Sequence, residues 1–250
     1  DQYEPGSTLK PFIVAAALEE GLVEGDTVFF CENGLTEIGG WPIHDHRPHG
    51  DLSVADVLRL SSNICVAKIG ALAGPKLLHD YLVGFGFGHK SGVELPGEIN
   101  GSLRPASRWR EINTATISYG QGIAVTALQM AAGYATLANG GVRMRPHIVS
   151  RIVSRDGELI ERTKPSVEGR IISQAVAREV TEMLEAVVGA SGTAPQAQVA
   201  GVSVAGKTGT AQKPGAGGYS NDRWLASFVG YFPAADPEIV ISVMIDEPTG

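Results

Sequence analysis

Three things are scarce or missing in this sequence of 250 residues: cysteine, long apolar runs and an excess of basic residues. Cys31 and Cys65 are too few for a disulfide framework; we expect two free thiols, although their spacing leaves one bridge open. No apolar run approaches the roughly 18 residues that cross a bilayer, and no signal-peptide pattern occurs. The net charge of −7 does not fit a nucleic-acid-binding surface. We therefore expect no disulfide scaffold, no membrane-spanning segment and no nucleic-acid partner in the residues given.

What is present is the composition of a folded protein with a sizeable core, 43% hydrophobic and 19% charged. Apolar residues at helical spacing predict helices at about 7–20, 53–60, 64–72, 75–83, 126–137 and 173–188. Runs rich in β-branched residues predict strands at 27–30, 202–205, 225–232 and 239–245, a hairpin over 148–160 turned at Asp156-Gly157, and a small glycine-rich loop at 215–218. Strand-rich ends around a helical subregion at about 51–145 predict a single α+β domain over 1–250, a three-layer α/β arrangement with an antiparallel sheet flanked by helices.

The stretch Glu4-Pro5-Gly6-Ser7-Thr8-Leu9-Lys10-Pro11 places a hydroxyl and an amine close together. Pro5-Gly6 is a breaker pair and Pro11 is tolerated in a first helical turn, so Ser7 is expected at a helix N-terminus. The unpaired N–H groups there favour a developing negative charge. Lys10 shares the face of Ser7, and a neutral lysine amine can take the proton of a serine hydroxyl. The pair predicts Ser7 as a nucleophile and Lys10 as its base.

Two further polar stretches follow in the chain. Ser61-Ser62-Asn63 lies in a predicted bend between two helices, and Lys207-Thr208-Gly209-Thr210 lies at the end of a β-rich run. Taken singly, S-x-x-K is expected about once by chance in a chain of this length, and each short motif is more often a cap, a turn or a solvated lysine. The ordered set S-x-x-K, S-D-N and K-T-G is typical of penicillin-binding proteins and β-lactamases, and serine takes the aspartate position here.

Longer stretches carry a more specific resemblance. They are YEPGSTLKPF, LSVADVLRLSSN, SYGQGIAVTALQMAAGYATLANGG, VAGKTGTAQKPG and SFVGYFPAADPEIVISVMIDEP. With them the sequence resembles the peptidoglycan D,D-transpeptidase domain of class B penicillin-binding proteins over nearly its whole length. The resemblance implies the penicillin-binding, β-lactamase-like serine transpeptidase fold. The triplet Ser61-Ser62-Asn63 is more similar to the division or sporulation type than to the elongation type, which tends to end this motif in aspartate.

The resemblance implies a catalytic role for five residues. Ser7 attacks the D-Ala-D-Ala carbonyl of a stem peptide, forms an acyl-enzyme and transfers it to an amine of a neighbouring strand. Lys10 acts as the base, and the charge of Lys207 lowers its pKa, since like charges disfavour protonation. Ser61 relays the proton to the departing amine, and Asn63 bonds the substrate backbone.

The same resemblance assigns the last motif to binding. Thr208 and Thr210 hold the terminal carboxylate of the substrate, and the backbone N–H groups of Ser7 and Thr210 form the oxyanion hole. Gly209 is interpreted as leaving room for a ligand against the strand edge.

Partners follow from the same family. They are peptidoglycan stem peptides of lipid-linked precursors or nascent strands, β-lactam inhibitors and the cell-wall synthesis machinery, on the extracytoplasmic side of the membrane; no cofactor is implied. The sequence begins six residues before Ser7 and stops after an apolar run. We therefore expect a piece of a longer protein, with strands missing at the sheet edges and a membrane anchor in a missing N-terminal segment.

Other functions have discriminating features. A β-lactamase needs a carboxylate that activates water, and the sequence holds no E-x-x-L-N segment. A D,D-carboxypeptidase passes the acyl group to water, and a penicillin-binding sensor or inactive module binds without crosslinking; the complete motif set argues against the inactive reading. His44, Asp45, His46 and His49, with Cys31, match no closed zinc pattern, so no metal site is predicted.

Overall fold

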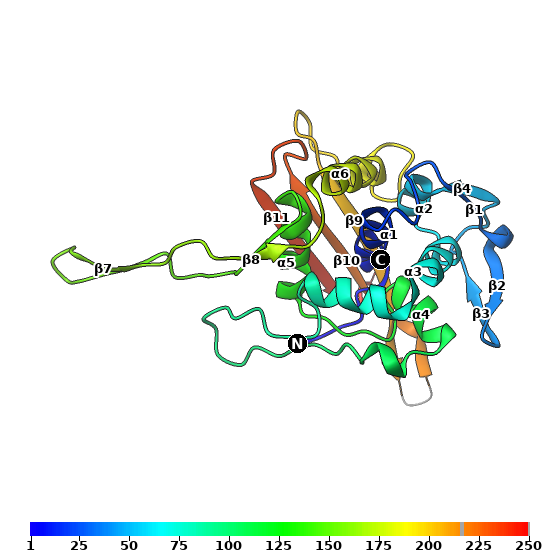
Figure 1. Cartoon of the computed structure of the whole chain (residues 1–250), viewed down its shortest axis with the longest axis horizontal. Coiled ribbons are helices and arrows are strands. Elements are labelled where there is room, and N and C mark those ends of the chain that lie inside the picture. The colour runs from blue at the N-terminus through cyan, green and yellow to red at the C-terminus, as the bar shows by residue number, and fades with distance from the viewer. Residues whose placement is uncertain (216–217, 250) are drawn as a thin grey trace.

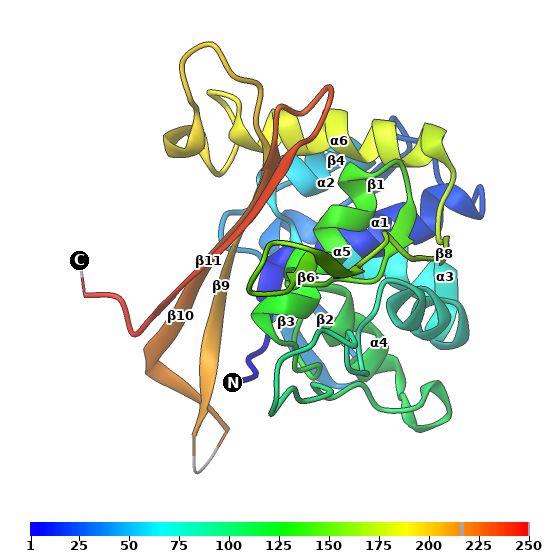
Figure 2. The ribbon, with the colours of Figure 1, turned by 90° about the vertical axis from the view of Figure 1, so that its left-hand side faces the viewer.

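The computed structural model describes residues 1–215 and 218–249. Its largest sheet is formed by the last three strands, β9 (Ala205–Gly215), β10 (Gly218–Phe232) and β11 (Ile239–Asp246), which are antiparallel in the order β11-β10-β9. Alternate residues of β10, such as Val229 and Tyr231, are fully buried because one face of the sheet is covered. Figure 2 shows this sheet edge-on, with the labelled helices on one side of it.

Three helices pack against the sheet or close to it: α1 (Lys10–Glu19), α5 (Ala127–Ala138) and α6 (Gln174–Val188). Helix α1 is apolar all round, so it runs through the core, where Phe12 packs against Phe85, Phe87 and Tyr134. Helix α6 is amphipathic and buries one face only, as its spacing predicts. Figure 1 shows α1 between the sheet and the helices at the other side of the molecule.

The segment 51–145 holds α2 (Val54–Leu60), α3 (Asn63–Gly84), α4 (Glu111–Ser118) and α5. Short strands β4 (Asp51–Ser53) and β5 (Val142–Met144) lie at its two ends. Hydroxyl caps stand at four of the helix starts expected from apolar spacing, where the side chains of Ser53, Ser62, Thr126 and Ser173 accept backbone N–H groups of the first turns. Helix α3 bends at Gly74, where the sequence predicts a new helix opening at Gly74-Pro75.

Helix α4 was not expected from the sequence. Its residues EINTATIS are poor helix formers, and Arg110 at the cap position carries no hydroxyl or carboxylate. The strands of the large sheet are also longer than predicted: β9 begins at Ala205 rather than 202 and runs on to Gly215, and β10 begins at Gly218 rather than 225. The two central residues of the glycine-rich loop expected at 215–218 lie outside the described residues.

Two small ribbons follow α1: β1 (Val28–Phe30) pairs with β4, and β2 (Leu35–Ile38) pairs with β3 (Trp41–His44). A disulfide joins Cys31, directly after β1, to Cys65 in the first turn of α3. The expectation of two free thiols is therefore wrong. Spacing could not reveal the bond, because only the fold brings the β1–β4 ribbon against α3.

Residues 142–170 leave the body, and residues 145–166 form a long arm, which Figure 1 shows projecting beyond α5. At its base β5 pairs with β8 (Val167–Arg170), and further out β6 (Arg151–Val153) pairs with β7 (Leu159–Arg162). The hairpin expected over 148–160 is confirmed, with its turn at Asp156-Gly157. The remaining described elements are the 3-10 turns η1 (Gly6–Leu9), η2 (Glu32–Gly34), η3 (Ala106–Arg108) and η4 (Pro195–Ala197). Within residues 1–215 and 218–249, no helix combines the length and the apolar character needed to cross a membrane.

Candidate active site

Ser7 lies in η1, and Lys10 is the first residue of α1, so the predicted helix start near Ser7 is confirmed. Ser7 is partly exposed, whereas Lys10 is fully buried. The Lys10 ammonium donates to the Ser61 carbonyl at 2.5 Å and to the Ser61 hydroxyl at 3.2 Å. The side-chain hydrogen bonds of Lys10 thus go to the second motif, while its backbone N–H donates to the carbonyl of Ser7.

Ser61 lies between α2 and α3, in the bend that the sequence predicts. Its backbone is left-handed, with φ 64° and ψ 39°, a conformation that a residue with a side chain adopts at a cost. This geometry turns both its carbonyl and its hydroxyl toward Lys10, and the Lys207 ammonium donates to the same hydroxyl at 2.9 Å. One hydroxyl therefore joins residues that are 51 and 146 positions away in sequence.

Both lysines are removed from water. Burial, and next the charge of Lys207, hold the pKa of Lys10 well below its ordinary value, while the carboxylate of Asp45 acts in the opposite direction. Burial lowers the pKa of Lys207 to about 7. A neutral amine at Lys10 is therefore accessible near neutral pH, which is the state a base needs.

Asp45 is a site residue that the sequence did not point to, except as part of a histidine-rich loop. Its carboxylate accepts from the Ser62 hydroxyl at 2.6 Å and from the backbone N–H groups of Asn63 and Ile64 at 2.5 and 3.0 Å. It thus binds the N-terminus of α3, where a negative charge is favourable. An aspartate in an aperiodic loop gives no sequence signal for such a contact, because the contact depends on how the loop folds back.

The second motif is held from that same loop. The amide of Asn63 donates to the carbonyl of His44 at 3.0 Å, and the Ser62 hydroxyl caps α3 at the N–H of Cys65. No group of three His, Cys, Asp or Glu side chains among the described residues is placed to hold a metal ion, and Cys31 is bonded to Cys65.

Strand β9, at the edge of its sheet, carries the third motif. Lys207 points into the protein, and by alternation Thr208 and Thr210 lie on the other face; Thr210 is exposed, and the Thr208 hydroxyl lies 3.2 Å from that of Thr193. The free edge of β9 and these two hydroxyls are therefore open to an extended ligand.

The structure explains glycine at position 209 differently from the sequence, which suggested room for a ligand. A Cβ at this position would lie 2.6 Å from the Ser227 hydroxyl, 2.8 Å from the Pro5 carbonyl and 2.9 Å from Thr8. These atoms belong to the neighbouring strand and to the segment that carries Ser7. The missing side chain therefore lets β9 pack against the segment that carries Ser7, and the space is filled by protein rather than by a ligand.

Known proteins share this arrangement. All of residues 1–250 match the family described as penicillin binding protein transpeptidase domain. The chain belongs to this family, in its class B branch. The expected resemblance and the α+β fold of that family are confirmed.

Similar proteins of this family include penicillin-binding protein PbpB of Mycolicibacterium smegmatis, 39% identical over 98% of the chain and 39% of that protein. Stage V sporulation protein D of Bacillus subtilis is 36% identical over 99% of the chain and 39% of its own length, in line with the division or sporulation type. The chain thus spans about two fifths of the length of these relatives.

Solved structures of penicillin-binding transpeptidases superpose on the whole chain. The transpeptidase domain of Burkholderia pseudomallei penicillin-binding protein 3 gives a TM-score of 0.91 at 39% identity, covering 100% of this chain and 72% of that one. Penicillin-binding protein 3 of Mycobacterium tuberculosis, complexed with ampicillin, gives 0.92 at 36% identity, covering 99% and 57%.

Proposed function

We propose that this domain is a peptidoglycan D,D-transpeptidase in which Ser7 is the nucleophile. The observation that carries the proposal is the convergence of two buried lysines, Lys10 and Lys207, on the hydroxyl of Ser61. Two cations held out of water around one hydroxyl are costly, and such perturbed groups cluster at functional sites. Strand β9, which carries Lys207, also places the open edge of the sheet beside the two lysines and the Ser61 hydroxyl.

In the first half-reaction the Ser7 oxygen attacks the carbonyl between the two D-alanines, and its proton passes to neutral Lys10. The new C–O bond forms as the C–N bond breaks, and the departing D-alanine amine receives a proton through Ser61, which is hydrogen-bonded to both lysines. Backbone N–H groups of Ser7 and Thr210 stabilise the oxyanion. In the second half-reaction an acceptor amine attacks the acyl carbon, the new C–N bond forms as the ester C–O bond to Ser7 breaks, and the proton that the amine loses returns to the Ser7 oxygen.

Binding groups flank this centre. Thr208 and Thr210 hold the terminal carboxylate of the stem peptide with the help of the positive charge of Lys207, and Asn63 bonds its backbone. An extended substrate adds its backbone to the edge of β9, as peptides do at open sheet edges. β-Lactams acylate Ser7 in the same way; the solved complex of the Mycobacterium tuberculosis relative with ampicillin supports this part of the proposal.

The setting of the activity is part of the proposal. The domain acts outside the cytoplasm on lipid-linked precursors or nascent strands, together with the cell-wall synthesis machinery. A membrane anchor in a segment N-terminal to the domain holds it there. The Cys31–Cys65 disulfide supports this setting, because such bonds persist in oxidising compartments.

Intact-mass spectrometry with benzylpenicillin tests the nucleophile. We expect a one-to-one adduct that persists for at least minutes in the wild type and no adduct in Ser7→Ala; an S7A variant that is still labelled would refute the assignment. Turnover within seconds would indicate a β-lactamase instead. Product analysis with a stem pentapeptide and an acceptor amine separates the remaining functions: a crosslinked amide supports the transpeptidase, hydrolysis alone indicates a carboxypeptidase, and acylation without either product indicates a sensor.

A further inference from the structure

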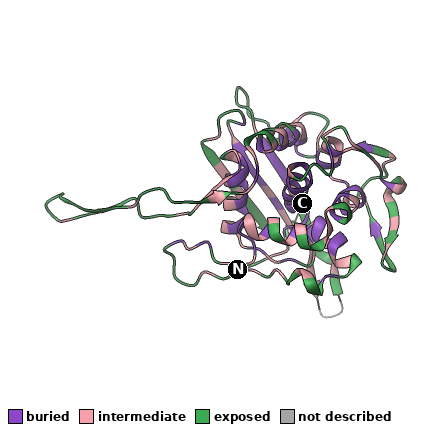
Figure 3. Cartoon of the chain, viewed as in Figure 1, coloured by how far each residue is buried: buried purple, intermediate pink, exposed green. Residues whose placement is uncertain are grey.

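The arm formed by residues 145–166, which carries β6 and β7, has no role in the proposed chemistry. Figure 3 shows it exposed along its length, far from the buried body. It carries Ile148, Ile152, Val153, Leu159 and Ile160, which are between 45% and 66% exposed. A two-stranded ribbon is marginal in water, and contiguous exposed apolar side chains mark interaction surfaces.

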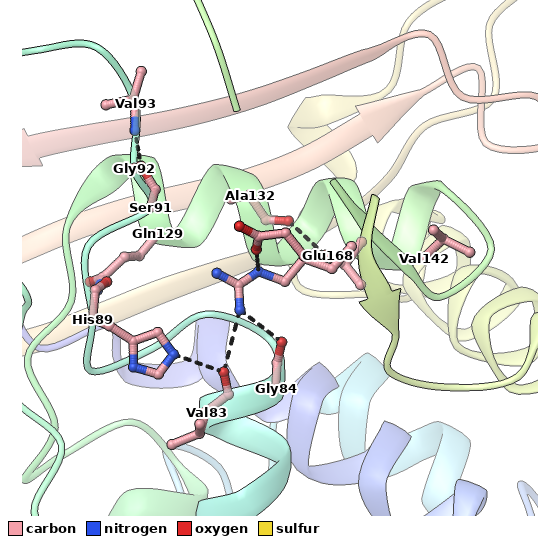
Figure 4. Close-up of polar contacts among 12 residues, drawn as sticks. Val83, Gly84, His89, Ser91, Gly92, Val93, Gln129, Ala132, Val142 and Glu168 are labelled. Carbon is pink, nitrogen blue, oxygen red and sulfur yellow. Dashed lines mark hydrogen bonds and ion pairs between the residues drawn. The ribbon is translucent and has the colours of Figure 1, made fainter. Parts of the chain in front are cut away.

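The arm is fixed at its base and is not a fraying end. Arg143 of β5 forms an ion pair with Glu168 of β8 at 2.9 Å, and its guanidinium also donates to the Gly84 carbonyl at 3.1 Å. The guanidinium thus contacts Glu168 and the carbonyls of Val83 and Gly84, and these three residues are labelled in Figure 4. Because Gly84 ends α3, the cation also meets the negative end of the helix. The arm is thus held out from the body at a defined place.

Two like-charged side chains lie opposite each other in the arm. Arg151 of β6 and Arg162 of β7 are direct cross-strand partners, and like charges in that position repel. Among the described residues neither arginine forms an ion pair within 4.0 Å. Val153 lies two residues beyond Arg151, and its cross-strand partner is Leu159, because the register shifts after the Ile152–Glu161 pair. Val153 and Leu159 therefore continue the face of the two arginines with apolar side chains.

The net positive charge of the arm favours binding of an acidic segment from a different protein. Residues 145–166 hold five basic and three acidic side chains in a chain whose net charge is −7, so two arms would repel each other. The tip, residues 154–158, is polar and charged, while the apolar side chains lie in the stem, which does not suit insertion of the tip into lipid. Both outer edges of the ribbon are open, which suits an added strand.

We propose that the β6–β7 arm binds an extended segment of another protein by strand addition, with acidic side chains of that segment paired with the guanidinium groups of Arg151 and Arg162. Apolar side chains of the partner cover Val153 and Leu159 on the same face. The added strand completes a three-stranded sheet and removes the cross-strand repulsion. This docking surface lies outside the candidate active site, so it does not depend on the proposed function.

Site-specific photo-crosslinking in cells of the source organism tests the proposal in the full-length protein. A photoreactive residue replaces Ile160, and a second variant carries it at Leu72, an exposed position on α3. We expect an adduct with another protein from position 160 only, with the crosslinked peptide rich in acidic and apolar residues. Arg151→Glu with Arg162→Glu should lower the adduct at least fivefold, whereas Arg151→Lys with Arg162→Lys should keep it.

Each other result overturns the proposal. An adduct with a second copy of the chain indicates self-association, and an adduct with lipid alone indicates a membrane contact. Equal or absent adducts at positions 160 and 72 show that the arm has no protein partner. Labelling of each variant by fluorescent penicillin serves as the folding control, because the arm lies away from Ser7.

Discussion

The Ser61 hydroxyl lies between two ammonium groups, and this arrangement links the charge state of one lysine to that of the other. In the proposed mechanism Lys10 must lose its proton to act as the base, and Lys207 disfavours the protonated form of Lys10 by its charge. As pH falls through the lowered pKa of Lys10, the base is protonated and acylation slows. The acid side of the pH profile therefore reports the environment of Lys10.

Lys207→Gln should move this acid limb to higher pH, because removal of the second cation raises the pKa of Lys10. Lys207→Arg keeps the cation, so the limb should stay in place even if the rate falls. The measurement is the rate of acylation by benzylpenicillin between pH 5 and 9. Identical limbs in the two variants would show that the charge of Lys207 does not tune Lys10.

Asp45→Asn should act in the opposite direction. The carboxylate raises the pKa of Lys10, so its neutralisation lowers that pKa further and moves the acid limb to lower pH. The variant also loses charged hydrogen bonds to Ser62 and to the start of α3, at a cost of about 2 kcal/mol. Urea denaturation and the pH profile measure the two effects, and Asp51→Asn, at an exposed position, is the control. If the acid limb of the pH profile does not move in Asp45→Asn, then Asp45 does not influence the pKa of Lys10.

The sequence predicts the motif residues but not their distances. Ser7, Lys10, Ser61 and Lys207 are recognisable because short motifs occur in a fixed order within longer matching stretches. Their convergence on one hydroxyl depends on tertiary packing, and Asp45 has neither a motif nor a periodic pattern. Contacts between a loop and a distant helix end leave no mark in local sequence.

Individual elements follow from local chemistry where caps and turns are strong. The hydroxyl-capped helices and the Asp156-Gly157 hairpin were predicted because their signals are local. Helix α4 and the first residues of β10 were missed, since packing against neighbours rather than propensity stabilises them. Strand β9 was recognised only in part, and its glycine was assigned to the wrong neighbour.

Gly209→Ala tests the packing of β9 on the Ser7 segment. The added Cβ meets backbone at Pro5, so the strand must shift; we expect a loss of about 2 kcal/mol in unfolding free energy and at least tenfold slower acylation. Gly84→Ala is the matched control, because its Cβ would approach only the flexible side chain of Ile171, at 3.3 Å. Denaturation and acylation rates check both. A Gly209→Ala variant with wild-type stability and acylation rate would mean that a side chain fits between β9 and the Ser7 segment.

The whole molecule combines a sheet with one face covered by helices and a ribbon region tied to α3 by the Cys31–Cys65 bond. The bond closes a sequence separation of 34 residues. It joins the β1–β4 ribbon to the helix whose first turn also holds Ser62 and Asn63. A change in the stability of the β1–β4 ribbon is therefore expected to alter the position of Ser62 and Asn63 in the second motif.

Replacement of both cysteines by serine should lower the unfolding free energy by about 3–4 kcal/mol, since a loop of this length is freed in the unfolded state. Urea denaturation with and without a thiol reductant is the measurement. The reductant should destabilise the wild type and leave the double variant unchanged. A reductant-insensitive wild type would show that the bond is not formed in the purified protein.

The close approach of β9, the Ser7 segment and the loop around Gly120 also limits how the protein can change during evolution. A Cβ at Gly120 would lie 2.0 Å from the Gly6 carbonyl, and one at Gly209 would lie 2.8 Å from the Pro5 carbonyl. A side chain at either position forces the backbone to shift, so glycine is strongly favoured at both. If Ser7 is the target of an inhibitor, we therefore expect substitutions that weaken inhibition to accumulate at the rim of the site rather than at these two glycines.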